Sequence, residues 1–238
     1  MSTPCRTLAS NVATLPAFSP ASRARLTSRD LDRFPGDTLF DRIARAVCGA
    51  GCLPRKELYE AWEMARRIRR LFRGGRIVDL GAGHGLLAQV LLLLDATSVG
   101  AVVADRALPP SSEKLHQALV AAWPALAGRV EFVAQPMDDV ELRPDDLVVS
   151  SHACGRLTDV VLDRAAAVRA RVAVLPCCHD LAACDGGNLD GWVDGAMAID
   201  LMRAVRLTDR GYRVRTLSIP AAITPKNRLL LGEPHKVT

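Results

Sequence analysis

Apolar residues in this chain follow a helical period first and then fall into short blocks separated by further helical stretches. Two helical stripes come first, over residues 37–49 and 54–72, because apolar side chains return every three or four positions. From residue 77 onward, short runs rich in β-branched residues alternate with helical segments, as is typical of strands. The runs that we predict to be strands are 77–80, 99–104, 130–133, 147–150, 172–175, 214–219 and 228–231.

Helical segments separate these runs. The same periodicity predicts helices over 86–94, from 111 to beyond Trp123, over 159–168 and over 190–210. Regular alternation of strand and helix favours a mostly parallel sheet, so we predict an α/β fold. The last two strands are joined by residues 220–227.

Length and composition limit the class of protein. The 238 residues fit one sizeable α/β domain with an extension. No run of eighteen apolar residues occurs, so we expect no membrane span. Seven cysteines without the spacing of a secreted scaffold indicate reduced thiols and a cytoplasmic protein. The net charge of +5 permits an anionic partner without requiring one.

The N-terminus differs from the rest in composition. Residues 1–29 carry four arginines and no acidic residue, which fits a disordered basic arm or an organellar transit peptide, and we prefer the arm. The predicted organisation is a flexible basic arm over 1–36, a helical cap over 37–75 and a cofactor-binding domain over 76–238. We predict no stable protein partner.

The turn after the first strand carries candidate cofactor chemistry. Asp79 ends the strand, and Gly81, Gly83 and Gly85 then alternate before an apolar helix. Glycines allow left-handed dihedrals and close approach of a ligand, and the helix start offers free N–H groups. The spacing is G-x-G-x-G, whereas dinucleotide-binding loops read G-x-G-x-x-G. A glycine-rich turn without a ligand is the alternative.

This glycine loop, with Asp79 before it, resembles the nucleotide-binding loop of Rossmann-like methyltransferases that use S-adenosylmethionine (SAM). The resemblance implies a SAM-dependent methyltransferase, with the loop under the amino-acid and ribose parts of the cofactor. It also implies a Rossmann-like, seven-stranded, mostly parallel sheet with a terminal antiparallel hairpin. The N-terminal helices would cover the substrate side.

Further cofactor contacts are expected at the ends of the next two strands. Asp105 stands twenty residues after Gly85, where a carboxylate can accept hydrogen bonds from both ribose hydroxyls; a capping role in a loop is the alternative. Met137 and Asp138 follow the third strand. In methyltransferases of this class an acidic or polar residue there often contacts the adenine, and Asp139 is an alternative to Asp138.

Two later strands both run into segments rich in histidine and cysteine. His152 and Cys154 follow the fourth strand, and Cys177, Cys178 and His179 follow the fifth. Ligands of open parallel sheets bind beyond the carboxyl ends of the strands. We therefore predict that these five side chains gather into the catalytic group.

The paired His-Ala-Cys-Gly and Pro-Cys-Cys-His segments resemble a narrower subgroup of methyltransferases. It includes the enzymes that 2′-O-methylate the tRNA acceptor stem and several methyltransferase-like proteins of animals. The resemblance covers about residues 50–234, including the segments 53–57 and 223–228. The tRNA enzymes also carry N-terminal zinc-binding segments, whereas this chain has only Cys48 and Cys52 there. RNA is thus one possible acceptor; a small molecule or protein side chain, and a catalytically silent binding protein, are the alternatives.

The histidine and cysteine group allows four interpretations. His152 or His179 could act as a general base, the thiols could bind a metal, one cysteine could be a nucleophile, or the cysteines could simply pack. No local segment has four-ligand spacing, so we predict no metal site and no zinc requirement for folding. Six arginines between Arg66 and Arg76, without an acid among them, indicate either a phosphate-contacting face or a solvated helix end.

Overall fold

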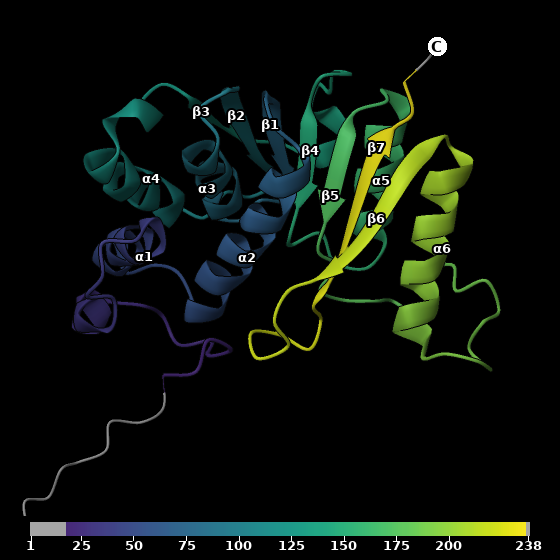
Figure 1. Cartoon of the computed structure of the whole chain (residues 1–238), viewed down its shortest axis with the longest axis horizontal. Helices are drawn as coiled ribbons and strands as arrows, with labels where there is room; N and C mark the ends of the chain where they lie inside the picture. Colours follow the sequence, from purple (N-terminus) through teal and green to yellow (C-terminus); the bar gives the residue numbers. More distant parts are fainter. Residues whose placement is uncertain (1–17, 237–238) are drawn as a thin grey trace, which may run out of the picture.

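The computed structural model describes residues 18–236 and shows one seven-stranded sheet with helices on both faces (Figure 1). The strand order is β3-β2-β1-β4-β5-β7-β6, with β1 to β5 parallel and β7 antiparallel to both β5 and β6. This confirms the predicted fold class, including the terminal hairpin. The strands are β1 (Gly75–Leu80), β2 (Ser98–Asp105), β3 (Val130–Ala134), β4 (Leu147–Ser150), β5 (Arg171–Val174), β6 (Tyr212–Ser218) and β7 (Arg228–Pro234).

Six α-helices and three short 3-10 helices are described, and the α-helices divide between the two faces of the sheet. The α-helices are α1 (Leu39–Ala50), α2 (Arg55–Leu71), α3 (Leu86–Leu94), α4 (Ser111–Ala122), α5 (Arg156–Ala167) and α6 (Gly195–Asp209). The 3-10 helices are η1 (Ser28–Arg33), η2 (Pro124–Leu126) and η3 (Met137–Asp139). The helices α1 to α4 cover one face, and α5 and α6 pack against the other. In the described residues, no helix is both long and apolar enough to cross a bilayer.

The central strands β1, β4 and β5 are mostly buried, and their side chains alternate between two cores, whereas the edge strands β3 and β6 are partly exposed. Ile77 of β1 packs in the core with α1 to α4, whereas its neighbour Val78 packs in the core with α5. The helix α3 is apolar on nearly every face, as predicted, and six of its first seven residues are buried apolar side chains. This rigid double-sided core fixes where each strand ends, and therefore where the loops begin.

The boundaries of α4, α5 and α6 differ from the prediction, in two cases for a clear local reason. The helix α4 ends at Ala122 instead of running past Trp123, because Pro124 opens the 3-10 helix η2. The helix α6 begins only at Gly195, where the Asp194 side chain accepts from the N–H of Met197 at 3.1 Å and caps the helix. The helix α5 begins at Arg156, three residues before the predicted start.

The segment from Phe18 to Gly36, assigned from sequence to a flexible arm, is docked on the helical cap. Leu26 and Phe34 are buried, and the N–H of Leu26 donates to the carbonyl of Leu53 at 2.9 Å. The ring of Phe18 lies edge-on to Phe34 with centroids 5.7 Å apart. Residues 1–17 of the predicted arm lie outside the described residues.

Candidate functional site

The glycine loop has the backbone that its sequence predicts. Gly81, Gly83 and Gly85 have φ values of 65°, 54° and 71°, in the left-handed region that favours glycine. At Gly85 a side chain would also collide with the core, because its Cβ would lie 2.6 Å from Cγ1 of Val103. The loop therefore presents bare backbone at the carboxyl end of β1, directly before the N-terminus of α3.

Asp79 is a buried carboxylate without a hydrogen-bond partner. Its side chain is 1% exposed, and neither carboxylate oxygen receives a hydrogen bond. Burial raises the pKa of Asp79 to about 8; the nearby N–H of Ala88, which does not reach hydrogen-bond geometry, offsets only part of this, and Asp105 raises it further. A lone buried carboxylate is costly, so this site favours a cationic or hydrogen-bond-donating ligand.

Asp105 and Met137 lie against the same loop. The N–H of Gly83 donates to Oδ2 of Asp105 at 3.0 Å, which leaves the other oxygen bonded only to the N–H of Ala107. The methyl of Met137 would lie 3.7 Å from a Cβ built on Gly81. Asp138, the next residue in η3, is exposed, and its side chain forms no hydrogen bond in the described structure. The structure thus brings together Asp79, the three glycines, Asp105 and Met137.

The loops after β4 and β5 are joined to each other and to the glycine loop. Ser150 donates to the carbonyl of Leu80 at 2.6 Å, which ties the end of β4 to the end of β1. The N–H of Gly155 donates to the carbonyl of Cys178 at 3.1 Å, which ties the two cysteine-bearing loops together. These bonds hold the cysteine loops beside the glycine loop, at the carboxyl ends of the parallel strands.

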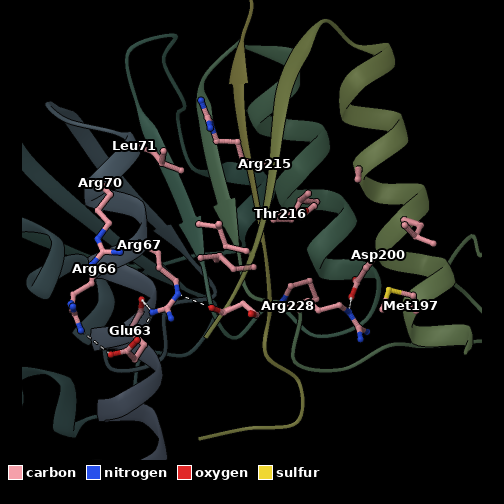
Figure 2. Close-up of a pocket in the computed structure, with 17 residues that line it drawn as sticks. Glu63, Arg66, Arg67, Arg70, Leu71, Met197, Asp200, Arg215, Thr216 and Arg228 are labelled. Atoms are coloured by element: carbon pink, nitrogen blue, oxygen red, sulfur yellow. Dashed lines mark hydrogen bonds and ion pairs between the residues drawn. The ribbon is translucent and has the colours of Figure 1, made fainter. Parts of the chain in front are cut away.

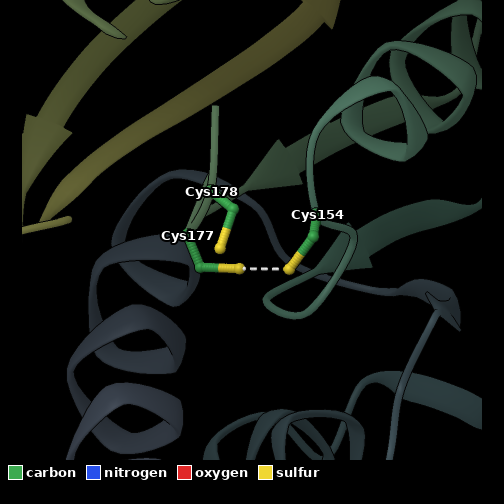
Figure 3. Close-up of side chains that lie close together, drawn as sticks. All are labelled: Cys154, Cys177 and Cys178. Carbon is green, nitrogen blue, oxygen red and sulfur yellow. Dashed lines mark hydrogen bonds between the residues drawn. The ribbon is translucent and has the colours of Figure 1, made fainter. Parts of the chain in front are cut away.

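Three of the five predicted catalytic residues converge here, as thiols (Figure 3). The Sγ atoms of Cys154, Cys177 and Cys178 lie within 4.8 Å of one another, and those of Cys154 and Cys177 are 2.8 Å apart. Burial raises the pKa of Cys154 and of Cys177, and the neighbouring sulfurs raise that of Cys177 further. Near neutral pH these two groups are therefore protonated thiols in the absence of a cation.

His152 faces the glycine loop instead of the thiols. Its Cδ2 would lie 3.8 Å from a Cβ on Gly83, and it lines a small recess with His84 and Glu57. The side chain of His152 is exposed to solvent, although many protein atoms lie around it. The resulting desolvation, with the positive charges of Lys56 and His84, lowers the pKa of His152. The imidazole is thus neutral near pH 7 and able to accept a proton.

His179 points away from the thiols, toward α6. Its Nε2 lies 2.8 Å from Oδ1 of Asp200, and its side chain is 2% exposed. Burial favours a neutral Asp200, but hydrogen bonds from His179 and Arg228 hold the pKa of this carboxyl below its usual value. Because the carboxylate holds Nε2 and Nδ1 is buried, we reassign His179 to a positioning role.

The start of α2 contributes residues that the sequence did not single out. Glu57 lines the recess beside His84 and His152, and burial, with a smaller effect of Glu60, raises its pKa to about 6. Lys56 donates to Glu60 at 2.6 Å one turn below. The sequence offered a signal, because residues 53–57 match the methyltransferase subgroup, but that match gave them no role.

Two of the six arginines around the end of α2, which the sequence assigned either to a phosphate-contacting face or to a solvated helix end, pair with acidic residues of other elements instead. Arg69 is 3% exposed and contacts Asp95 at 3.1 Å, and Arg76 pairs with Asp146 at 2.9 Å. Arg73 also approaches Asp95, at 3.9 Å. These acids lie on other elements, so the local sequence could not reveal them.

The remaining arginines line an open groove of about 1020 Å3 along the edge strand β6, between α2 and α6 (Figure 2). Its charged lining residues are Glu63, Arg66, Arg67, Arg70, Asp200, Arg215 and Arg228. Glu63 pairs with Arg66 and Arg67, and Arg228 pairs with Asp200. In the described part of the chain, Arg70 and Arg215 form no ion pair. The groove excludes the glycine loop and adjoins the cysteine loops only through Pro176.

The chain belongs to the methyltransferase domain family, which matches residues 56–184. The match begins at the start of α2 and includes the glycine loop and all three clustered cysteines. It confirms the predicted enzyme class and SAM as the cofactor. A search of curated proteins finds no match.

Three solved structures with the same fold are methyltransferases by title. An O-methyltransferase family protein from Burkholderia thailandensis is 18% identical over 90% of this chain and 64% of its own, with a TM-score of 0.52. The SAM-dependent methyltransferase SibL is 18% identical over 89% and 66%, and mitomycin 7-O-methyltransferase MmcR is 19% identical over 87% and 63%, both with TM-scores of 0.50. This chain spans slightly less than two thirds of their lengths, and at these identities the likeness concerns the fold.

The residues at the glycine loop fit SAM. The cofactor carries an ammonium group, a sulfonium and ribose hydroxyls, and the site offers the unpaired Asp79 and the accessible Asp105. The left-handed glycines remove the side chains that would fill the space above the loop. Bound SAM supplies an electrophilic methyl group, and Asp79, Gly81, Gly83 and Asp105 are the residues that would hold the cofactor.

Proposed function

We propose that this protein is a SAM-dependent methyltransferase that acts on a nucleophile brought to the carboxyl ends of β4 and β5. The observation that carries the proposal is Asp79, a buried carboxylate left unpaired directly below a left-handed glycine loop. An unpaired buried carboxyl costs stability in the free chain, which favours a bound cofactor at this position; a catalytically silent protein that binds SAM would share this feature, so the case for catalysis rests on His152. Positioning of the two reactants would supply much of the rate enhancement.

His152 is the proposed general base. It faces the glycine loop, and its lowered pKa leaves it neutral and able to take a proton from the acceptor near pH 7. Glu57, across the same recess, is a carboxyl whose pKa of about 6 allows it to accept a hydrogen bond from the cofactor or the acceptor. His179 and Asp200 would act indirectly, by holding the loop that carries Cys177 and Cys178.

A small molecule or a protein side chain is the first candidate acceptor, because the recess at His152, between α2, the glycine loop and the loop after β4, is small. RNA, the acceptor of the tRNA-modifying subgroup that the cysteine segments resemble, is the second candidate. The observation that favours RNA is the arginine-lined groove beside Pro176. The pairing of Arg69 with Asp95 and of Arg76 with Asp146 reduces that support.

Transfer of a labelled methyl group tests the proposal. The purified chain is incubated with methyl-labelled SAM and with separate fractions of metabolites, protein and RNA. We expect label in one fraction with wild type, and a loss of more than about a hundredfold with His152→Ala, in line with a lost general base. Label in no fraction, although SAM binds, would favour a silent binding protein.

A further inference from the structure

The thiols of Cys154, Cys177 and Cys178 form a three-sulfur ligand set from two loops. Within residues 18–236 this is the one group of three or more His, Cys, Asp or Glu side chains whose ligand atoms meet. We propose that the three thiolates bind one Zn2+ ion and leave a fourth coordination position open to a thiol. The sequence predicted no metal because no local segment holds four ligands; here two loops supply three.

The distances suit zinc. Zinc–thiolate bonds of about 2.3 Å in a tetrahedral site place the sulfur atoms about 3.8 Å apart. The three Sγ atoms already lie within 4.8 Å of one another, and the 2.8 Å separation of Cys154 and Cys177 would have to widen by about 1 Å. Soft thiolate ligands select zinc over the hard cations calcium and magnesium.

The loops that carry the thiols are held in place by bonds that leave every sulfur free. Gly155 donates its N–H to the carbonyl of Cys178, and Thr158 donates its hydroxyl to the carbonyl of Ala153 at 2.6 Å. The N–H of Ala153 in turn donates to Ser150 at 3.2 Å. The ligand set is therefore formed by the fold, and zinc need not assemble it.

The surroundings of the thiols indicate an open site. Structural zinc sites are closed by four protein ligands, whereas catalytic sites use three and keep one position for water or substrate. Cys154 and Cys178 are exposed, and in the described part of the chain no histidine or carboxylate joins the three sulfurs as a fourth ligand. A soft ligand from solution, such as a thiol, can therefore complete the coordination.

A thiol bound at the fourth position would release its proton to water or to His152 and be held as its thiolate, the nucleophilic form; its sulfur would then form the new bond to the methyl group as the methyl–sulfonium bond of SAM breaks and S-adenosylhomocysteine leaves. The assignment of a thiol as the methyl acceptor rests on the proposed function, whereas the zinc site is independent of that function. Binding replaces three S–H bonds by three zinc–sulfur bonds and releases about three protons for each ion.

The test uses the full chain without an affinity tag, reduced with a phosphine so that no added thiol competes. The metal-free protein is titrated with Zn2+ against a chromophoric chelator, and Co2+ is used as a spectroscopic probe. We expect one ion per chain, release of about three protons, and thiolate-to-cobalt charge-transfer bands. Adding 2-mercaptoethanol to the cobalt form should change its spectrum.

The controls are cysteine-to-serine variants. Cys154→Ser, Cys177→Ser and Cys178→Ser should each weaken zinc binding by more than about tenfold, since loss of supporting contacts alone costs that much. Cys184→Ser, outside the group, should bind as wild type. Circular dichroism of the metal-free variants should match wild type, because the thiols lie on loops outside the core.

Several results would overturn the proposal. Equal zinc retention by all four variants, or no stoichiometric ion in wild type, would mean adventitious binding. A Cys154–Cys177 disulfide in protein isolated under reductant would remove two ligands. A cobalt spectrum unchanged by added thiol would show that no thiol binds at the fourth position. Calorimetric titration with SAM on the same samples separates the two proposals. Binding of SAM by a protein that binds no zinc would contradict the metal site, and binding of zinc by a protein that binds no SAM would contradict the proposed function.

Discussion

The N–H of Gly155 donates a hydrogen bond of 3.1 Å to the carbonyl of Cys178, and this bond joins the loop after β4 to the loop after β5. Gly155 has φ 57° and ψ −129°, a combination that is costly for any residue with a side chain. Cys154 directly precedes it. The placement of the first thiol against the other two therefore depends on one glycine.

Gly155→Ala should move Cys154 away from Cys177. A Cβ at Gly155 would meet Asp180 at an ordinary 3.5 Å, so the change acts through the backbone, at a cost of about 1–3 kcal/mol. We expect slower formation of a Cys154–Cys177 disulfide under a mild oxidant, followed by mass spectrometry. Gly191→Ala, where no atom lies within 4 Å of the added Cβ, is the control. Equal rates in wild type and Gly155→Ala would contradict this role.

SAM binding should release a proton. Burial holds the pKa of Asp79 at about 8 in the free chain, so the carboxyl is protonated at pH 7. A cationic ligand lowers that pKa and ionises the group. Affinity for SAM should therefore rise with pH up to about 8 and then level, while the stability of the free chain falls over the same range.

Calorimetry at pH 7 in two buffers with different ionisation enthalpies measures this release. We expect close to one proton per SAM for wild type and none from this group for Asp79→Asn, which keeps the shape of the side chain. Affinity independent of pH between 6 and 8, with no proton released by wild type, would show that the cofactor does not pair with Asp79.

Arg69 should be a structural residue. It is 3% exposed, contacts Asp95 at 3.1 Å and donates to Ser98 at 2.8 Å, and burial lowers its pKa to about 10. Arg69→Ala leaves Asp95 with less of its charge compensated, so we expect a loss of about 3 kcal/mol in the free energy of unfolding. Arg70→Ala, on an exposed neighbour, should stay within about 0.5 kcal/mol of wild type in urea titrations.

The groove along β6 offers a direct test of RNA binding. If RNA is the acceptor, replacing Arg66, Arg70 and Arg215 with Gln should weaken binding of total tRNA and flatten its salt dependence, because phosphate contacts release counterions. The matched control replaces Arg29, Arg143 and Arg210, which are exposed outside the groove. Equal, weak retention of all three proteins on filters at two salt concentrations would remove RNA from the candidates.

The sequence predicts the fold well because its signals are local. The apolar period of α3 and the short β-branched runs of β1 and β4 depend on neighbours within a few residues. The glycine loop is predictable for the same reason, because a left-handed φ favours glycine at each of the three positions. The docked segment around Leu26 escaped prediction because its burial depends on Leu53, far along the chain.

The candidate site was predictable in its location and less so in its contacts. Both cysteine segments follow neighbouring parallel strands, which is enough to bring Cys154 and Cys177 together. The direction of a side chain within a loop is not set by spacing, so His179 could not be assigned to Asp200. The partners of Arg69 and Arg76 likewise lie on distant elements.

The central claim is that the glycine loop and Asp105 bind SAM. Calorimetric titration of the purified chain with SAM and with NAD, for wild type, Asp105→Ala and Asp105→Asn, tests it most directly. Because Asp105 loses its bonds to Gly83 and to the cofactor, we predict SAM affinity more than about tenfold weaker in Asp105→Ala, and little NAD binding in wild type. The SAM affinity of Asp105→Asn should lie between those of wild type and Asp105→Ala. Unchanged SAM affinity in Asp105→Ala, or NAD binding as tight as SAM in wild type, would contradict the account.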